Sequence, residues 1–98
     1  MEHDINSIRK EIDEIDRELV ALFLQRMNCS ARVAEYKREH GLPVLDASRE
    51  KALLEKISEL SGKEFEEYTK VLYETILSIS RDHQVKKLNV DSNGENDR

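Results

Sequence analysis

The sequence predicts an all-α fold with three helices, which are long, short and medium in chain order. Apolar residues recur every three or four positions over most of the chain, and the 98 residues include only three glycines and one proline. So few turn-forming residues disfavour an all-β sandwich or barrel. The length allows one small domain. We assign residues 1–88 to a helical domain and expect residues 89–98, which are polar, to form a disordered tail.

A long helix is predicted from residue 5, with Lys37 and Arg38 in its last turn, and its apolar positions over residues 5–36 form one seam with coiled-coil spacing. The seam comprises Ile5, Ile8, Ile12, Ile15, Leu19, Leu22, Cys29, Val33 and Tyr36. Asp4 or Asn6 is a candidate N-cap, and Gly41 followed by Pro43 marks the end. A helix of about 34 residues is about 50 Å long, whereas a small domain is about 30 Å across. We therefore expect a partner helix, most simply from a second copy of the chain.

Two further helices follow a short extended connector. The second is expected over residues 46–60, with an apolar stripe at Leu53, Leu54, Ile57 and Leu60. Residues 61–64 (SGKE) combine a helix-stopping glycine with the S-x-x-E pattern of a capping box. The third helix should therefore begin at once, and we expect it to end near Gln84 or Lys86.

Composition narrows the classes of function. Sixteen Lys and Arg against twenty-one Asp and Glu give a net charge of −5, which disfavours nucleic acid or an anionic membrane as partner. The single cysteine, Cys29, excludes an internal disulfide framework and a multi-cysteine metal site. No apolar run reaches about 18 residues, and the N-terminus lacks a basic-then-apolar pattern. We expect a soluble, cytoplasmic protein.

Charged residues interrupt or flank the seam of the long helix. Arg26 stands where the spacing requires an apolar residue, so it either sets the register, pairs with a glutamate of a neighbouring helix, or binds an anion inside the bundle. Lys37 lies about three turns later on nearly the same face, although a lysine in the last turn also suits the helix dipole. Arg9 lies about 25 Å before Arg26 along the helix. It could share a pocket with Arg26 only across two chains.

Polar residues also occur at the start of the second helix and on the otherwise apolar face of the third. Asp46 is a candidate N-cap, and Arg49 and Glu50 either form a first-turn charge pair or face the bundle interior. In the third helix, a row that steps by four changes from apolar residues to Ser80 and Gln84. These two either face the interior near one end of the bundle or mark a frayed helix end.

No nucleophile or metal site is evident in the sequence. Cys29 has no convincing histidine partner, and the three histidines, His3, His40 and His83, lack the spacing of metal ligands. Carboxylates are plentiful, but nothing marks a paired acid and base.

In order and spacing, these residues resemble the all-helical class of chorismate mutases. The local strings resemble it too: IRKEIDEID at residues 8–16, VAEYK at 33–37 and VLDASRE at 44–50. The resemblance covers residues 5–86. It implies an intertwined homodimer with two equivalent sites, each completed by one residue of the partner chain. It also implies the [3,3] rearrangement of chorismate, a dicarboxylate, to prephenate, without cofactor or metal.

The resemblance assigns cations to the substrate carboxylates and donors to the ether oxygen. Arg26 and, from the partner chain, Arg9 would hold the two carboxylates, with Ser80 assisting. Lys37 and Gln84 would meet the ether oxygen, where negative charge grows as the bond breaks. Holding the flexible dianion in its reactive conformer would supply the rest of the catalysis.

The remaining assignments concern the substrate hydroxyl. Glu50 and the region of Asp46 would hold it, with Arg49 as a further ligand or as the group that orients Glu50. Two alternatives stay open: an isochorismate–pyruvate lyase on the same scaffold, and a non-catalytic helical dimerisation module. The acidic residues at positions 46 and 50 favour the mutase, because the lyase branch has apolar residues there.

Overall fold

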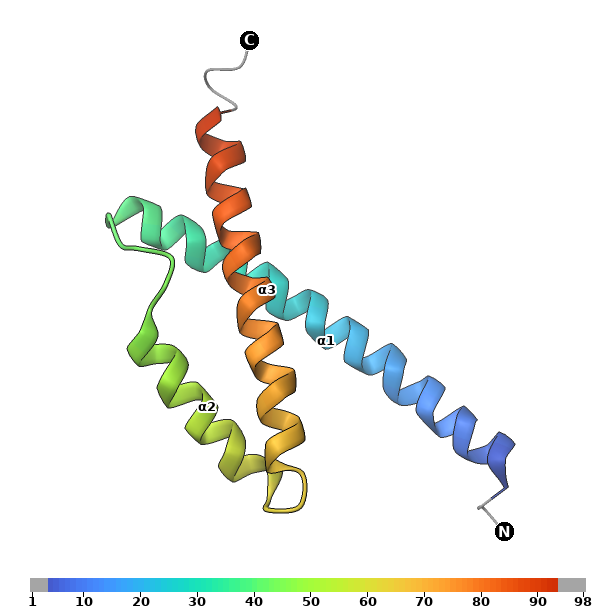
Figure 1. Cartoon of the computed structure of the whole chain (residues 1–98). Helices are drawn as coiled ribbons and strands as arrows, with labels where there is room; N and C mark the ends of the chain where they lie inside the picture. Colours follow the sequence, from blue (N-terminus) through green and yellow to red (C-terminus); the bar gives the residue numbers. More distant parts are fainter. Residues whose placement is uncertain (1–3, 94–98) are drawn as a thin grey trace.

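Three helices make up the described part of the chain. The computed structural model describes residues 4–93, a range in which no strand occurs. α1 spans Ile5–Glu39, α2 spans Ala47–Ser61 and α3 spans Glu66–Asn93 (Figure 1). The lengths are 35, 15 and 28 residues, so the predicted all-α class and the order long, short, medium are confirmed.

The two ends of α1 follow local sequence signals. Asp4 is the N-cap, and its side chain accepts a hydrogen bond of 3.1 Å from the backbone N–H of Asn6. At the other end, Gly41 takes a φ of 63° and the N–H of Leu42 donates to the carbonyl of Lys37 at 2.8 Å. Only glycine adopts such a left-handed conformation at no steric cost, which explains why the chain turns there.

The turn between α2 and α3 differs from the predicted capping box. Ser61 is the last residue of α2, and its hydroxyl donates backward to the carbonyl of Ile57 at 2.8 Å. The hydroxyl therefore does not cap α3, which begins at Glu66 rather than at once. Gly62, with a φ of 77°, provides the turn.

α3 is also longer than predicted. The helix continues to Asn93 instead of ending near Gln84 or Lys86, so it includes residues 89–93 of the predicted tail. Residues 94–98 lie outside the described residues. The signal for a helix end was weak here, because no glycine or proline occurs between Lys63 and Asn93.

α3 is the element that holds the chain together. It packs against both α1 and α2, whereas within residues 4–93 α1 and α2 do not pack on each other. Figure 1 shows α3 crossing α1, with α2 running beside the first half of α3 and the N-terminal half of α1 extending away from both. The radius of gyration is 17.7 Å, well above the roughly 13 Å of a compact domain of this size.

Very little apolar surface is buried within one chain. Ala34, Ile57 and Leu77 are the buried hydrophobic residues of the described range. The predicted seam of α1 is open instead: Ile12 is 48% exposed, and Leu22 is 60% exposed. This core is small for a chain of 98 residues and leaves the long helix half-covered. None of the three described helices is long and apolar enough to cross a membrane.

Candidate active site

A cavity of about 320 Å³ with both polar and apolar walls lies where α1, the start of α2 and the second half of α3 converge. Seven of the eight side chains selected from the sequence line it, namely Arg26, Lys37, Asp46, Arg49, Glu50, Ser80 and Gln84. They come from all three helices and from positions up to 58 residues apart. The fold therefore brings the predicted set together, while the role of each residue stays a prediction.

Arg9 is the exception. It is exposed and does not line the cavity of its own chain. It belongs to the N-terminal half of α1, which extends away from α2 and α3 (Figure 1). This position agrees with the expectation that Arg9 cannot act beside Arg26 of the same chain.

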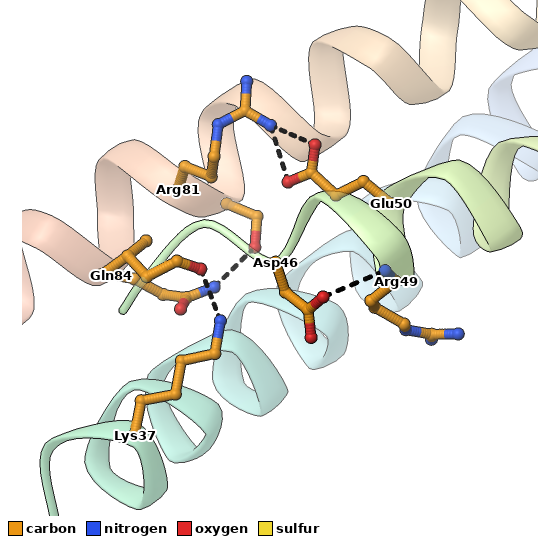
Figure 2. Close-up of polar contacts among 8 residues, drawn as sticks. Lys37, Asp46, Arg49, Glu50, Arg81 and Gln84 are labelled. Atoms are coloured by element: carbon orange, nitrogen blue, oxygen red, sulfur yellow. Dashed lines mark hydrogen bonds and ion pairs between the residues drawn. The ribbon is translucent and has the colours of Figure 1, made fainter. Parts of the chain in front are cut away.

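Glu50 is held by an arginine that the sequence reasoning missed. The Nη1 of Arg81 lies 2.5 Å and 2.7 Å from the two carboxylate oxygens of Glu50, and the contact joins α3 to α2 (Figure 2). The side chains are 36% and 22% exposed, so the pair is partly withdrawn from water. The first-turn pairing of Glu50 with Arg49 is therefore not what the structure shows. A signal existed: Arg81 follows the buried Leu77 by four residues, on the inward face of α3.

Asp46 is expected either to cap α2 or to contact a ligand, and the structure shows the cap. Its Oδ1 accepts a hydrogen bond of 3.1 Å from the backbone N–H of Arg49, as expected of the N-cap of α2. Asp46 also lines the cavity. A carboxylate has lone pairs beyond those used in a cap, so the same side chain can accept a further hydrogen bond from a ligand.

Lys37 reaches from the last turn of α1 across to the connector before α2. Its Nζ donates to the carbonyl oxygen of Val44 at 2.5 Å (Figure 2). An ammonium group has three protons, so two remain for other acceptors in the cavity. The structure thus gives Lys37 a specific partner and direction, beyond a general interaction with the helix dipole.

A buried chain of hydrogen bonds joins α1 to α3 beneath the cavity. The Ser30 hydroxyl lies 2.9 Å from the Ser80 hydroxyl, and Gln84 Nε2 lies 3.3 Å from the same Ser80 oxygen. Ser30, Ser80 and Gln84 are only 5%, 7% and 7% exposed, so the frayed-end interpretation of Ser80 and Gln84 is wrong. Gln84 Oε1 is buried and has no hydrogen-bond partner among the described residues. Its amide is therefore a polar group with unused capacity at the cavity wall.

Arg26 contacts an aromatic ring instead of a glutamate. Its guanidinium carbon lies 6.0 Å from the centroid of the Tyr73 ring, within cation–π range. Within residues 4–93, no carboxylate lies at salt-bridge distance from Arg26. The glutamate-pairing alternative therefore does not hold within one chain. The charge of Arg26 is available to an anion in the cavity.

The cavity is locally positive although the chain is acidic. Four cationic side chains line it, Arg26, Lys37, Arg49 and Arg81, against the two carboxylates of Asp46 and Glu50. Two positive charges remain uncompensated, which suits a small dianion. The described residues also include no group of three His, Cys, Asp or Glu placed to hold a metal ion. The absence of a metal from the chemistry remains a prediction.

One further polar residue of the cavity wall, Ser30, is not singled out by the sequence pattern. Ser30 was overlooked because the seam was drawn through Cys29 and Val33, whereas the residues of α1 that are buried in the structure are Ser30 and Ala34. Small residues let two helices cross closely, which is the signal that could have identified them. Cys29 itself is exposed at the cavity wall, and its sulfur accepts a hydrogen bond from Arg32.

Comparison with known proteins gives consistent matches. A bifunctional chorismate mutase/prephenate dehydratase of Buchnera aphidicola is 35% identical over 96 residues, which cover 96% of this chain and 25% of that protein. The chorismate mutase of Methanocaldococcus jannaschii is 42% identical over 53 residues, or 54% of each chain. The T-protein of Haemophilus influenzae is 41% identical over 51 residues, or 52% of this chain and 14% of that protein.

The matched segments cover about half of the Methanocaldococcus protein and a quarter or less of the two others. No solved structure matches the chain. The family model of chorismate mutase type II matches residues 8–85, which include every cavity residue discussed above. This chain belongs to the chorismate mutase type II family.

Proposed function

We propose that the chain catalyses the [3,3] rearrangement of chorismate to prephenate. The observation that carries this proposal is the cavity, which combines uncompensated cations, a buried amide with unused capacity and a fixed carboxylate. The reaction is an isomerisation: the ether C–O bond breaks, a C–C bond forms, and no atom enters or leaves. Such a reaction needs only a reactive conformer and stabilisation of developing charge.

The carboxylates of the substrate would bind to the arginines of the cavity. Arg26 has no carboxylate partner of its own within the described chain, so its guanidinium can form two parallel hydrogen bonds with one carboxylate. Arg9 of a second chain would take the other carboxylate. Ser80, which is fixed by Ser30, would assist at the same carboxylate.

The ether oxygen would lie between Lys37 and Gln84. Lys37 keeps two protons after its bond to Val44, and Gln84 Nε2 keeps one after its bond to Ser80. Both groups are fixed before the substrate arrives, so little reorganisation is needed as negative charge grows on the oxygen. The substrate hydroxyl would donate to Glu50, with the region of Asp46 beside it and Arg49 as a further ligand.

A second copy of the chain is part of the proposal. A groove of about 610 Å³ with mainly apolar walls runs between α1 and α3, lined among others by Leu19, Leu22, Phe23, Leu72 and Ile76. It continues the exposed seam of α1, and we assign it to the α1 of a partner molecule. The homodimer would cover the seam and bring Arg9 of one chain to the cavity of the other. A cytoplasmic location, with neither nucleic acid nor a membrane as partner, also remains a prediction.

Two alternatives make different predictions about the same cavity. An isochorismate–pyruvate lyase would release pyruvate, but the carboxylates of Asp46 and Glu50 favour a substrate whose hydroxyl is held, as in the mutase. A purely structural dimer would need the charge of Arg26 to be neutralised by a carboxylate within the bundle. Arg26 faces Tyr73 instead, which favours a ligand-binding cavity.

The test is a direct assay of the purified protein. Loss of chorismate absorbance should follow addition of protein, and NMR should identify prephenate, because substrate and product have the same mass. A coupled assay for pyruvate with isochorismate as substrate tests the lyase. If neither substrate is consumed and calorimetry detects no binding of a chorismate-like dicarboxylate, the chain is a dimerisation module and the proposal is wrong.

A further inference from the structure

Arg81 makes an ion pair that joins α3 to α2 and lies at the wall of the cavity. One nitrogen, Nη1, contacts both oxygens of Glu50, which leaves the Nη2 and Nε protons of the arginine unused in this contact. Each carboxylate oxygen keeps a lone pair for another donor. Glu50 is therefore oriented by the pair but still able to accept a hydrogen bond.

Among the described residues, Arg81 is the cation that forms an ion pair with this carboxylate. Arg49 is its neighbour in sequence, yet Figure 2 shows the Arg49 side chain extending away from the Glu50 carboxylate. The backbone of Arg49 is bonded to Asp46 instead. The orientation of Glu50 therefore depends on α3, on a residue adjacent to Ser80.

We propose that Arg81 is a positioning residue for the reaction: it fixes the Glu50 carboxylate that accepts the substrate hydroxyl and neutralises its charge toward the incoming dianion. This inference rests on the proposed function. Without Arg81, the carboxylate of Glu50 would lie unpaired beside the two carboxylates of the substrate, where like charges repel. It would also be free to rotate away from the hydroxyl.

A role in stability alone makes a different prediction. Water still reaches this partly buried ion pair and screens it, so the pair contributes only modestly to folding. Loss of Arg81 should therefore change turnover far more than the melting temperature. The effect should also depend on Glu50 being present and charged.

The experiment is a double-mutant cycle with Arg81→Met and Glu50→Gln, assayed with chorismate. Methionine keeps most of the length of the arginine stem without its charge. We expect Arg81→Met to lower kcat/KM by up to about 100-fold, through both a higher KM and a lower kcat, as for a misplaced contact group. In the Glu50→Gln background the same substitution should cost about threefold or less, because there is no charge left to orient or neutralise.

Arg81→Lys and Lys86→Met complete the design. Arg81→Lys keeps the charge and should recover part of the lost activity; if Arg81→Met does not fold, it takes the place of Arg81→Met in the cycle. Lys86→Met removes an exposed i,i+4 pair with Asp82 on the same helix, away from the cavity, and should leave activity unchanged. Equal losses in both backgrounds, or wild-type kinetics for Arg81→Met, would overturn the inference. If the unmodified chain does not convert chorismate, the proposed function itself fails.

Discussion

The hydroxyl of Ser30 on α1 lies 2.9 Å from the hydroxyl of Ser80 on α3, and both residues are buried where the two helices cross. Ser30 Oγ also lies 3.3 Å from the backbone carbonyl of Ser80 and donates to it. The contact fixes the rotation of α3 relative to α1. Because Gln84 follows Ser80 by one turn and bonds to its hydroxyl, the same contact sets the position of the amide at the cavity wall.

Ser30→Ala tests this relationship. The substitution removes both contacts of the Ser30 hydroxyl with Ser80 and should lower the free energy of unfolding by about 1–2 kcal/mol. It should also raise KM for chorismate a few-fold, because Ser80 loses its fixed rotamer. Denaturant unfolding and steady-state kinetics measure the two effects. The exposed Ser78 of α3 provides the matched control, and Ser78→Ala should change neither quantity. A Ser30→Ala protein with unchanged stability would show that the contact contributes nothing.

The open seam of α1 predicts that folding and dimerisation are coupled. A chain whose buried hydrophobic residues are Ala34, Ile57 and Leu77 has too little core to be stable alone. The melting midpoint should therefore rise with protein concentration. Calorimetry over a hundredfold range of concentration, with sedimentation to measure mass, checks this. A folded and active monomer at micromolar concentration would contradict it.

Arg9 and Arg26 should complement each other between chains. Arg9→Ala and Arg26→Ala should each be nearly inactive alone, because every site of such a homodimer lacks one cation. After mixing and exchange, a heterodimer should have one site with both defects and one intact site. Its activity should approach about half that of the wild type. No recovery, despite exchange verified by mass spectrometry of tagged chains, would mean that Arg9 does not act across the dimer.

Gln84→Glu should make activity depend on pH. At neutral pH an ionised carboxylate would repel the charge that develops on the ether oxygen, so kcat should fall by about 10²- to 10³-fold. A protonated carboxyl can donate a hydrogen bond, and burial raises its pKa, so activity should rise as the pH falls through that pKa. The unmodified protein should show no such gain. A wild-type pH profile at full activity would mean that Gln84 does not touch the reacting oxygen.

Asp4 predicts a pH effect at the N-terminus of α1. Hydrogen bonds from the backbone N–H of Asn6 and the hydroxyl of Ser7 hold the pKa of Asp4 below its ordinary value of 3.8. The cap therefore stabilises the first turn fully above pH 3.8, and the stabilisation is lost as the pH falls below that value through the lowered pKa. The protection of the first-turn amides against hydrogen exchange, relative to their intrinsic exchange rates at each pH, should fall in this range. Asp4→Asn, which keeps an oxygen acceptor without the charge, should remove the pH dependence.

Sequence periodicity was sufficient for the parts of the site that depend on one helix. An α-helix has 3.6 residues per turn, so Arg26 and Lys37, eleven residues apart, lie on nearly the same face. Ser80 and Gln84, four residues apart, share a face for the same reason. Asp46 was identifiable as a cap from its type and position. The fold class and the order of the helices follow from the same local signals.

The contacts between helices could not be obtained in that way. The pairing of Arg81 with Glu50 depends on how α3 is rotated against α2, and no local pattern encodes that angle. The Ser30–Ser80 contact depends in the same way on the crossing of α1 and α3. The expected contact of Arg9 is with a second molecule, and the residue spacing within one helix gives no information about that contact.

The contrast between a positive cavity and an acidic chain has a consequence for diffusion. With a net charge of −5, the protein as a whole repels a dianion at long range, and only within about 8 Å, the Debye length at physiological ionic strength, do the cavity cations dominate. Lower ionic strength extends the range both of the repulsion by the net negative charge and of the attraction by the cavity cations. Encounter is thus not accelerated by the long-range steering of oppositely charged pairs. Selectivity among anions must arise after collision, from how slowly a well-fitted dianion leaves.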